Sequence, residues 1–137
     1  MRRWRVLVVD DDAASRILLR RMLGQAGHEA ALAEDGPEAL RALAAEDFDA
    51  VLMDVLMPGL DGLELTRLIR AGAHKVRNPN IPIIAVTANA MKGDEDACLQ
   101  AGMNAYVAKP IRPDSLRSVI ERVLRGAVSG PAAAGSP

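Results

Sequence analysis

Residues 6–12 read Val-Leu-Val-Val-Asp-Asp-Asp, a continuous apolar run that ends in three acids. Four apolar residues in succession, three of them β-branched, are typical of a strand that is buried on both faces of a sheet. Short apolar runs recur at 30–33, 50–53, 81–86 and 105–108. The sequence therefore predicts five strands.

Helical patterns separate these runs and follow the last one. A first helix is expected over residues 14–26, with Gly24 and Gly27 marking its end, and Pro37 opens a second helix. Asp61 and Glu64 form the pattern of a capping box for a third helix, and a weakly amphipathic fourth is expected over about 90–101. The last helix has the clearest apolar stripe, made of Leu116, Val119, Ile120, Val123 and Leu124. Strands alternating with helices predict a single α/β domain with a parallel sheet covered on both faces.

Composition excludes several classes of function. The 137 residues leave room for one domain, and half of them are hydrophobic, as in soluble globular proteins. Lys plus Arg (17) nearly balances Asp plus Glu (18), which argues against nucleic-acid binding through bulk positive charge. A single cysteine excludes a disulfide framework and suits a reducing cytoplasm. No apolar stretch is long enough to span a membrane.

The chain changes character after Arg125. Residues 126–137 consist almost wholly of Gly, Ala, Ser and Pro, which cannot bury enough apolar surface to offset their ordering entropy. We therefore expect a folded domain over residues 3–125 and a flexible tail or linker over 126–137.

Ionisable and polar residues follow the predicted strands. Asp10 and Asp11 follow the first, Asp54 the third, Thr87 the fourth and Lys109 the fifth. The carboxyl ends of parallel strands meet at one edge of a sheet, where ligands bind in such folds. Carboxylates about 5 Å apart repel by roughly 3 kcal/mol, so the group would either hold protons or bind a cation. Hard oxygen ligands favour Mg²⁺ over Zn²⁺, and a lysine beside them suits a phosphoryl group.

A structural explanation competes with this one for each single residue. An Asp that follows a strand is commonly a helix cap, and Asp12 fits that role before the first helix. Four such residues at strand ends are harder to explain by chance. His28 and His74 have no Cys or second His at ligand spacing, so we expect loop or surface roles for both.

Four motifs in order resemble the receiver domains of response regulators in two-component signalling, in their hybrid-histidine-kinase form. The motifs are residues 6–12 (VLVVDDD), 53–62 (MDVLMPGLDG), 87–94 (TANAMKGD) and 101–111 (AGMNAYVAKPI). The resemblance implies a flavodoxin-like, doubly wound five-stranded parallel sheet of order 2-1-3-4-5 with five helices.

The resemblance also implies roles for individual residues. Asp54 would be the phosphoacceptor, with Mg²⁺ (or Mn²⁺ in its place) bound directly by Asp11 and Asp54 and through water by Asp10. The backbone carbonyl of Leu56 would complete the protein ligands.

Thr87 and Lys109 would contact the phosphoryl oxygens, and Tyr106 would be the switch aromatic that turns inward as Thr87 moves. The Lys109–Pro110 bond is expected to be cis. Thr87 as a plain helix cap and Tyr106 as an ordinary strand aromatic stay open as alternatives. The apolar Leu56 cannot orient an attacking water, which favours a phosphorylated state that is not especially short-lived.

The function expected from this resemblance is a cytoplasmic phosphoacceptor module, not an enzyme beyond its own phosphoryl transfer and autodephosphorylation. Its partner would be a histidine kinase or a histidine phosphotransfer protein, without direct contact to nucleic acid or membrane. Phosphorylation would alter the surface formed by the fourth helix, fifth strand and fifth helix. A scaffold that binds partners without phosphorylation is one alternative. A metal-dependent phosphatase is another, disfavoured because Leu56 stands where an acid-base residue is needed.

Overall fold

The computed structural model describes residues 3–55, 57, 59, 61–88 and 92–129. Five parallel strands form one sheet in the order β2-β1-β3-β4-β5, which confirms the predicted doubly wound topology. The strands are β1 (Arg5–Val9), β2 (Glu29–Ala33), β3 (Ala50–Asp54), β4 (Ile83–Thr87) and β5 (Ala105–Ala108).

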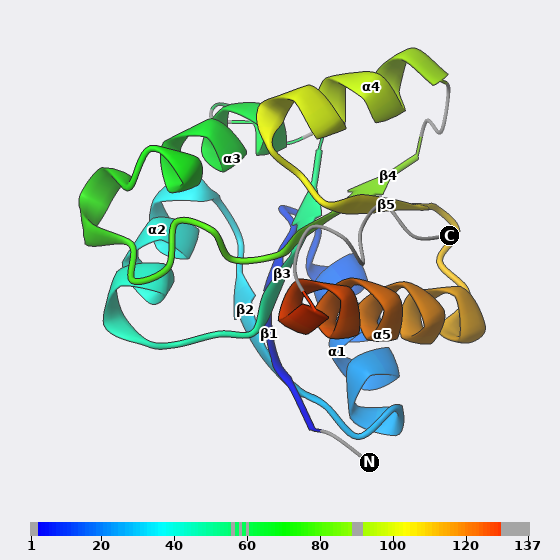
Figure 1. The fold of residues 1–137 in the computed structure, drawn as a ribbon. Coiled ribbons are helices and arrows are strands. Elements are labelled where there is room, and N and C mark those ends of the chain that lie inside the picture. Colours follow the sequence, from blue (N-terminus) through cyan, green and yellow to red (C-terminus); the bar gives the residue numbers. More distant parts are fainter. Residues whose placement is uncertain (1–2, 56, 58, 60, 89–91, 130–137) are drawn as a thin grey trace.

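Four α-helices and one short 3₁₀ turn connect the strands, and a fifth α-helix follows β5. They are α1 (Ala13–Gln25), α2 (Gly36–Ala45), α3 (Gly62–Arg70), the turn η1 (Ala73–Lys75), α4 (Lys92–Ala101) and α5 (Pro113–Ser129). Figure 1 shows α2 and α3 on one side of the sheet and α1 and α5 on the other. Among the described residues, none of the helices has the length and apolarity needed to cross a bilayer.

The sheet separates two hydrophobic clusters, as expected for strands that are buried on both faces. Alternate residues of each strand point to opposite sides. In β1, Leu7 and Val9 join the cluster under α2 and α3, whereas Val6 and Val8 join the cluster under α1 and α5. All four side chains are at most 1% exposed, which is why the run at 6–9 carries no polar alternation.

Local cap chemistry explains where three helices begin. Asp12, Asp35 and Asp61 each accept a hydrogen bond from the backbone N–H three residues later, at 2.8–2.9 Å. Gly27 follows α1 with φ +90°, a conformation open to glycine. The predicted cap at Asp61 is thereby confirmed, and α1 begins and ends within one residue of its predicted bounds.

Among the described residues, two predicted boundaries differ from the structure by two residues or more. The fourth strand begins at Ile83 instead of residue 81, because Pro82 has no N–H to donate to a ladder and the N–H of Ile81 bonds back to Asn78 at 3.1 Å. The last helix continues to Ser129, so residues 126–129, assigned to a tail from the sequence, are helical. A helix tolerates Gly126 at a cost of about 1 kcal/mol, and the strong breaker, Gly130–Pro131, comes later.

Candidate functional site

Four of the parallel strands bring a polar side chain to the same edge of the sheet. Asp54 and Thr87 are the last residues of β3 and β4, while Asp10 and Lys109 directly follow β1 and β5. The ladder continues past the strand ends, since the Lys109 N–H donates to the Thr87 carbonyl at 2.7 Å. Rigid backbone therefore positions these groups.

Three carboxylates converge at this edge. One ligand oxygen from each of Asp10, Asp11 and Asp54 lies within 4.8 Å of the others. Asp10 and Asp54 are only 1% and 6% exposed, whereas Asp11 faces solvent. At such separations each carboxylate pair repels by about 3 kcal/mol at an effective dielectric near 20. The cluster therefore favours a cation.

Lys109 supplies part of the compensating charge. Its Nζ lies 3.6 Å from Oδ2 of Asp10 and 4.0 Å from Oδ2 of Asp54. One ammonium faces three carboxylates, so negative charge remains at the cluster. A divalent cation can offset this charge and still leave the ammonium available to an anionic ligand.

One oxygen of Asp10 is left for such a cation. Oδ1 accepts from the backbone N–H of Asp12 at 2.9 Å, whereas the buried Oδ2 accepts no hydrogen bond among the described residues and has the Lys109 ammonium at 3.6 Å. A buried acceptor without a donor is costly. Hard carboxylate oxygens, one of them unsatisfied, fit Mg²⁺ better than a softer metal.

Asp12, the third acid of the run, is occupied as a helix cap. Its Oδ2 accepts from both the backbone N–H and the hydroxyl of Ser15 at 2.9 Å. These hydrogen bonds lower the pKa of Asp12, and the bond from the backbone N–H has the larger effect. The capping interpretation of Asp12 is therefore confirmed.

Arg16 supports the site without being part of the predicted set. Its Nη1 donates to the backbone carbonyl of Asp10 at 2.7 Å, and its Nη2 lies 3.8 Å from the Glu34 carboxylate after β2. The guanidinium thus links the end of β1 to α1 and β2. In the sequence, Arg16 looks like the other arginines of α1, and only the contact distinguishes it.

Gly62, also absent from the predicted site, sits directly against the backbone of Asp54. A Cβ at this position would lie 2.5 Å from the Asp54 carbonyl oxygen and 2.9 Å from Cα of Val55. The Gly62 N–H donates to the Val55 carbonyl at 3.0 Å. In the sequence, the one signal for this role of Gly62 was its position directly after the helix cap Asp61.

The predicted switch residues Thr87 and Tyr106 lie on the neighbouring strands β4 and β5. Thr87 is 5% exposed and lies at the same sheet edge. Tyr106 is half-buried in β5, paired in register with Ala85. Leu56 lies outside the described residues. The Lys109–Pro110 peptide bond is cis, as predicted.

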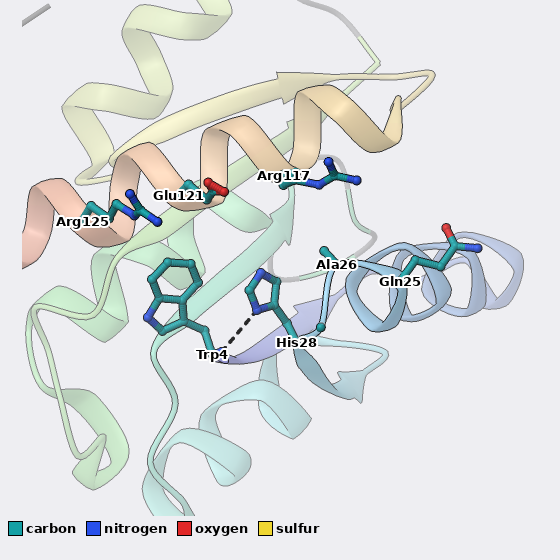
Figure 2. A pocket seen from close by; sticks show the side chains of 8 residues that line it. Trp4, Gln25, Ala26, His28, Arg117, Glu121 and Arg125 are labelled. Atoms are coloured by element: carbon teal, nitrogen blue, oxygen red, sulfur yellow. Dashed lines mark hydrogen bonds between the residues drawn. The ribbon is translucent and has the colours of Figure 1, made fainter. Parts of the chain in front are cut away.

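His28 lies in the loop between α1 and β2, as expected, but it is buried and not at the surface. Its Nδ1 accepts from the Trp4 backbone N–H at 3.2 Å, and the two rings lie 5.2 Å apart between centroids. Burial lowers the pKa of His28, although Glu121 acts in the opposite direction. Figure 2 shows both rings below the α5 side chains of Arg117, Glu121 and Arg125. These residues line a hollow of about 320 Å³. His74 is exposed, as expected.

Comparison with known proteins agrees with this geometry. The family described as "Response regulator receiver domain" matches residues 6–121. The sensor protein GacS of Pseudomonas syringae pv. syringae is 41% identical over 128 residues, which are 93% of this chain and 14% of that protein. The response regulator MprA of Mycolicibacterium vanbaalenii is 41% identical over 121 residues, 88% of this chain and 50% of that protein. The chain thus spans half or less of the length of these relatives.

Solved structures show the same fold. The receiver domain of sensor histidine kinase PA1611 from Pseudomonas aeruginosa, with a magnesium ion coordinated in its active site cleft, has a TM-score of 0.80 and 39% identity over 90% of this chain and 99% of that one. The Vibrio cholerae chemotaxis protein CheY4 has a TM-score of 0.79 and 29% identity over 89% of this chain and 99% of that one.

Proposed function

Because this chain belongs to the response regulator receiver domain family, we propose that it accepts a phosphoryl group on Asp54 in a Mg²⁺-dependent reaction. Receiver domains are signalling modules of two-component and phosphorelay systems. The observation that carries the proposal is the convergence of three carboxylates and Lys109 at one sheet edge. Asp54 is the last residue of β3, a strand that is buried along its whole length.

The metal would be held by Asp11 and Asp54 directly, by Asp10 through water and by the backbone carbonyl of Leu56. The unsatisfied Oδ2 of Asp10 supports this arrangement, as does the magnesium reported for the PA1611 receiver domain. When bound, Mg²⁺ would offset negative charge on the transferred group and on the carboxylates. Mn²⁺, another hard divalent ion, would substitute.

The transfer itself would use the Asp54 carboxylate as nucleophile. One of its oxygens would form a bond to the phosphorus of a partner's phosphohistidine while the P–N bond breaks, and the imidazole would leave with the bonding electron pair and take up a proton. Lys109 would pair with a phosphoryl oxygen, and the 4.0 Å between its Nζ and Asp54 Oδ2 supports this role. The Thr87 hydroxyl would donate a hydrogen bond to another phosphoryl oxygen. Slow hydrolysis of the acyl phosphate would return the module to its resting state.

Phosphorylation would shift a two-state equilibrium of the surface over α4, β5 and α5. Thr87 ends β4 and Tyr106 lies in the neighbouring strand β5, so a change at the phosphoryl group could reach that surface through adjacent backbone. We infer that Thr87 and Tyr106 are the switch residues. The partner would be a histidine kinase or a phosphotransfer protein in the cytoplasm, which is supported by the sensor kinases among the relatives.

The receiver body would comprise residues 3–125, and the last turn of α5, residues 126–129, would extend beyond it.

Purified chain incubated with Mg²⁺ and acetyl phosphate should gain one phosphoryl group by intact mass. Asp54→Asn should abolish the gain, while Asp96→Asn, which alters an exposed acid of α4, should retain it. A wild-type chain that gains no phosphoryl group under conditions that saturate other receivers would refute phosphoacceptance and favour the scaffold alternative.

A further inference from the structure

A second concave surface lies away from the strand ends, between α2 and the segment that links α3 to β4. This groove has a volume of about 620 Å³ and is lined on one side by α2. The α2 residues recur at i, i+3, i+4, i+7 and i+8, and are Pro37, Leu40, Arg41, Ala44 and Ala45. The groove therefore runs along the helix for about 12 Å, at about 1.5 Å per residue.

The floor of the groove is apolar and its outer end is made of small side chains. Leu40 from α2 is 4% exposed, and Leu68 from α3 is half-buried beside it. Ala44 and Ala45 leave room for another backbone to approach closely. Such a channel, about two helical turns long, matches the space that an amphipathic helix fills when it binds in a groove.

The two charged residues that line this groove are both basic. Arg41 contributes from α2 and Lys75 from η1, beside the imidazole of His74. All three are exposed, and none of them has an ion pair within the described part of the chain. The two acids that follow the end of α2 already have partners, since Glu46 pairs with Arg5 and Asp47 lies 3.5 Å from Arg77. The positive charge is therefore available to an external anion.

The basic side of the groove is the 3₁₀ turn η1, which has a strained backbone and is followed by a residue that hydrogen-bonds to α2. His74 and Lys75 have φ of +56° and +63°, a left-handed conformation that non-glycine residues adopt at a cost. Arg77 fixes the segment that follows: its N–H donates to the Leu43 carbonyl at 3.1 Å, and its Nη2 donates to the Ala45 carbonyl at 2.7 Å. Both walls are thus preorganised for binding.

We propose that this groove is a docking site for an amphipathic helix of a partner protein, with small apolar side chains on one face flanked by acidic residues. Leu40 and Leu68 would contact the apolar face. Arg41 and Lys75, on opposite walls, would pair with acids on either side of it. The site is separate from the α4–β5–α5 surface, so it would recruit a partner without depending on Asp54.

The test uses the full ¹⁵N-labelled chain and a helix-stabilised peptide of about 15 residues, long enough to stay helical, with Leu and Ala on one face and Glu on its flanks. A second peptide carries Lys in place of every Glu. We expect amide shifts in α2 and η1 with the acidic peptide, and affinity for the Lys peptide at least about tenfold weaker. Arg41→Glu and Ala44→Glu should each weaken acidic-peptide binding by about fivefold or more. Arg20→Glu on α1, also a reversal of an exposed charge, should leave it unchanged.

Thermal unfolding of each variant verifies that it is folded. Equal affinity for the two peptides, shifts confined to α1 and α5, or no shift at about 1 mM peptide would overturn the proposal. It would also be overturned if α2 and η1 shift with protein concentration alone, which indicates a second copy in the groove, or if the groove binds anionic vesicles and not the acidic peptide.

Discussion

Gly62→Ala should damage both the stability of this chain and the geometry of its phosphoacceptor. The added Cβ would lie 2.5 Å from the Asp54 carbonyl oxygen, 2.9 Å from Cα of Val55 and 3.1 Å from Cγ of Met53. Two of these three atoms belong to the backbone, so no side chain can rotate to relieve the contact with them. Gly62 cannot easily retreat either, because its carbonyl accepts from Thr66 Oγ1 at 2.8 Å.

The magnitude follows from the cost of overpacking. Inserting a methyl group into a filled space costs about 1–3 kcal/mol, and contact with rigid backbone places this substitution near 2–3 kcal/mol. At about 4 °C per kcal/mol for a domain of this size, the melting temperature should fall by about 8–12 °C. Displacement of the Asp54 backbone should slow phosphorylation by about ten- to hundredfold, since reactive groups tolerate little misplacement.

Gly24→Ala provides the matched control. A Cβ at Gly24, in the exposed part of α1, meets nothing within 4 Å. Because alanine is the better helix former, this variant should gain about 0.5–1 kcal/mol and melt about 2–4 °C higher.

Thermal unfolding by circular dichroism and the initial rate of phosphorylation from acetyl phosphate, both with saturating Mg²⁺, measure the two effects. A Gly62→Ala chain that melts within about 1 °C of the wild type and is phosphorylated at the same rate would refute the steric conflict with the Asp54 backbone. Equal destabilisation of Gly24→Ala would refute it as well.

Lys109→Met should raise Mg²⁺ affinity by about tenfold in calorimetry, since the ion no longer shares the cluster with an ammonium, while phosphorylation slows; unchanged affinity would contradict this electrostatic account. For His28, burial lowers the pKa in the folded chain and Glu121 opposes it. Between the folded pKa of His28 and about pH 6.5, the unfolded chain therefore binds more protons than the folded chain. The contribution of neutral His28 to the free energy of unfolding is complete above about pH 6.5 and is lost as the pH falls through the folded pKa. Urea unfolding should show a weaker pH dependence in His28→Gln, and an identical dependence would exclude His28 as its source. Arg70 donates to three backbone carbonyls at 2.7–2.9 Å, so Arg70→Met should lower the free energy of unfolding by about 3 kcal/mol. Arg67→Met, an exposed control on the same helix, should change it by no more than about 0.5 kcal/mol, and equal losses would refute the role of these hydrogen bonds.

The sequence predicted the acidic site because only local information was needed for it. The apolar run at 6–9 identifies a strand, and alternation with helices makes the strands parallel. Parallel strands place their carboxyl ends at one edge of the sheet, so residues that follow them, such as Asp10 and Lys109, lie at the same edge although 99 positions separate them in the chain. Their placement at this edge required no knowledge of side-chain packing, but β3 and β4 separate the two strands, so the 3.6 Å contact depends on the reach of the Lys109 side chain.

Element boundaries were less predictable where a single backbone group decides them. Hydrophobicity extends the fourth apolar run to Ile81, but Pro82 cannot donate to the ladder, so the strand begins at Ile83. Similarly, composition suggested an end to the folded chain at Arg125, whereas the helix continues to Ser129 because its hydrogen bonds tolerate a glycine.

By itself, the sequence determined the order of strands and helices, the two-sided burial of the sheet and the set of charged groups at its edge, because periodicity and strand polarity are short-range properties of the chain. Only the tertiary structure decided that Arg16 holds the Asp10 carbonyl, that His28 is buried against Trp4 and that Gly62 leaves no room for a methyl group. It also decided that α2 and η1 enclose a basic groove. These features depend on atoms that packing brings together at distances of a few ångströms, for which no spacing along the chain provides a signal.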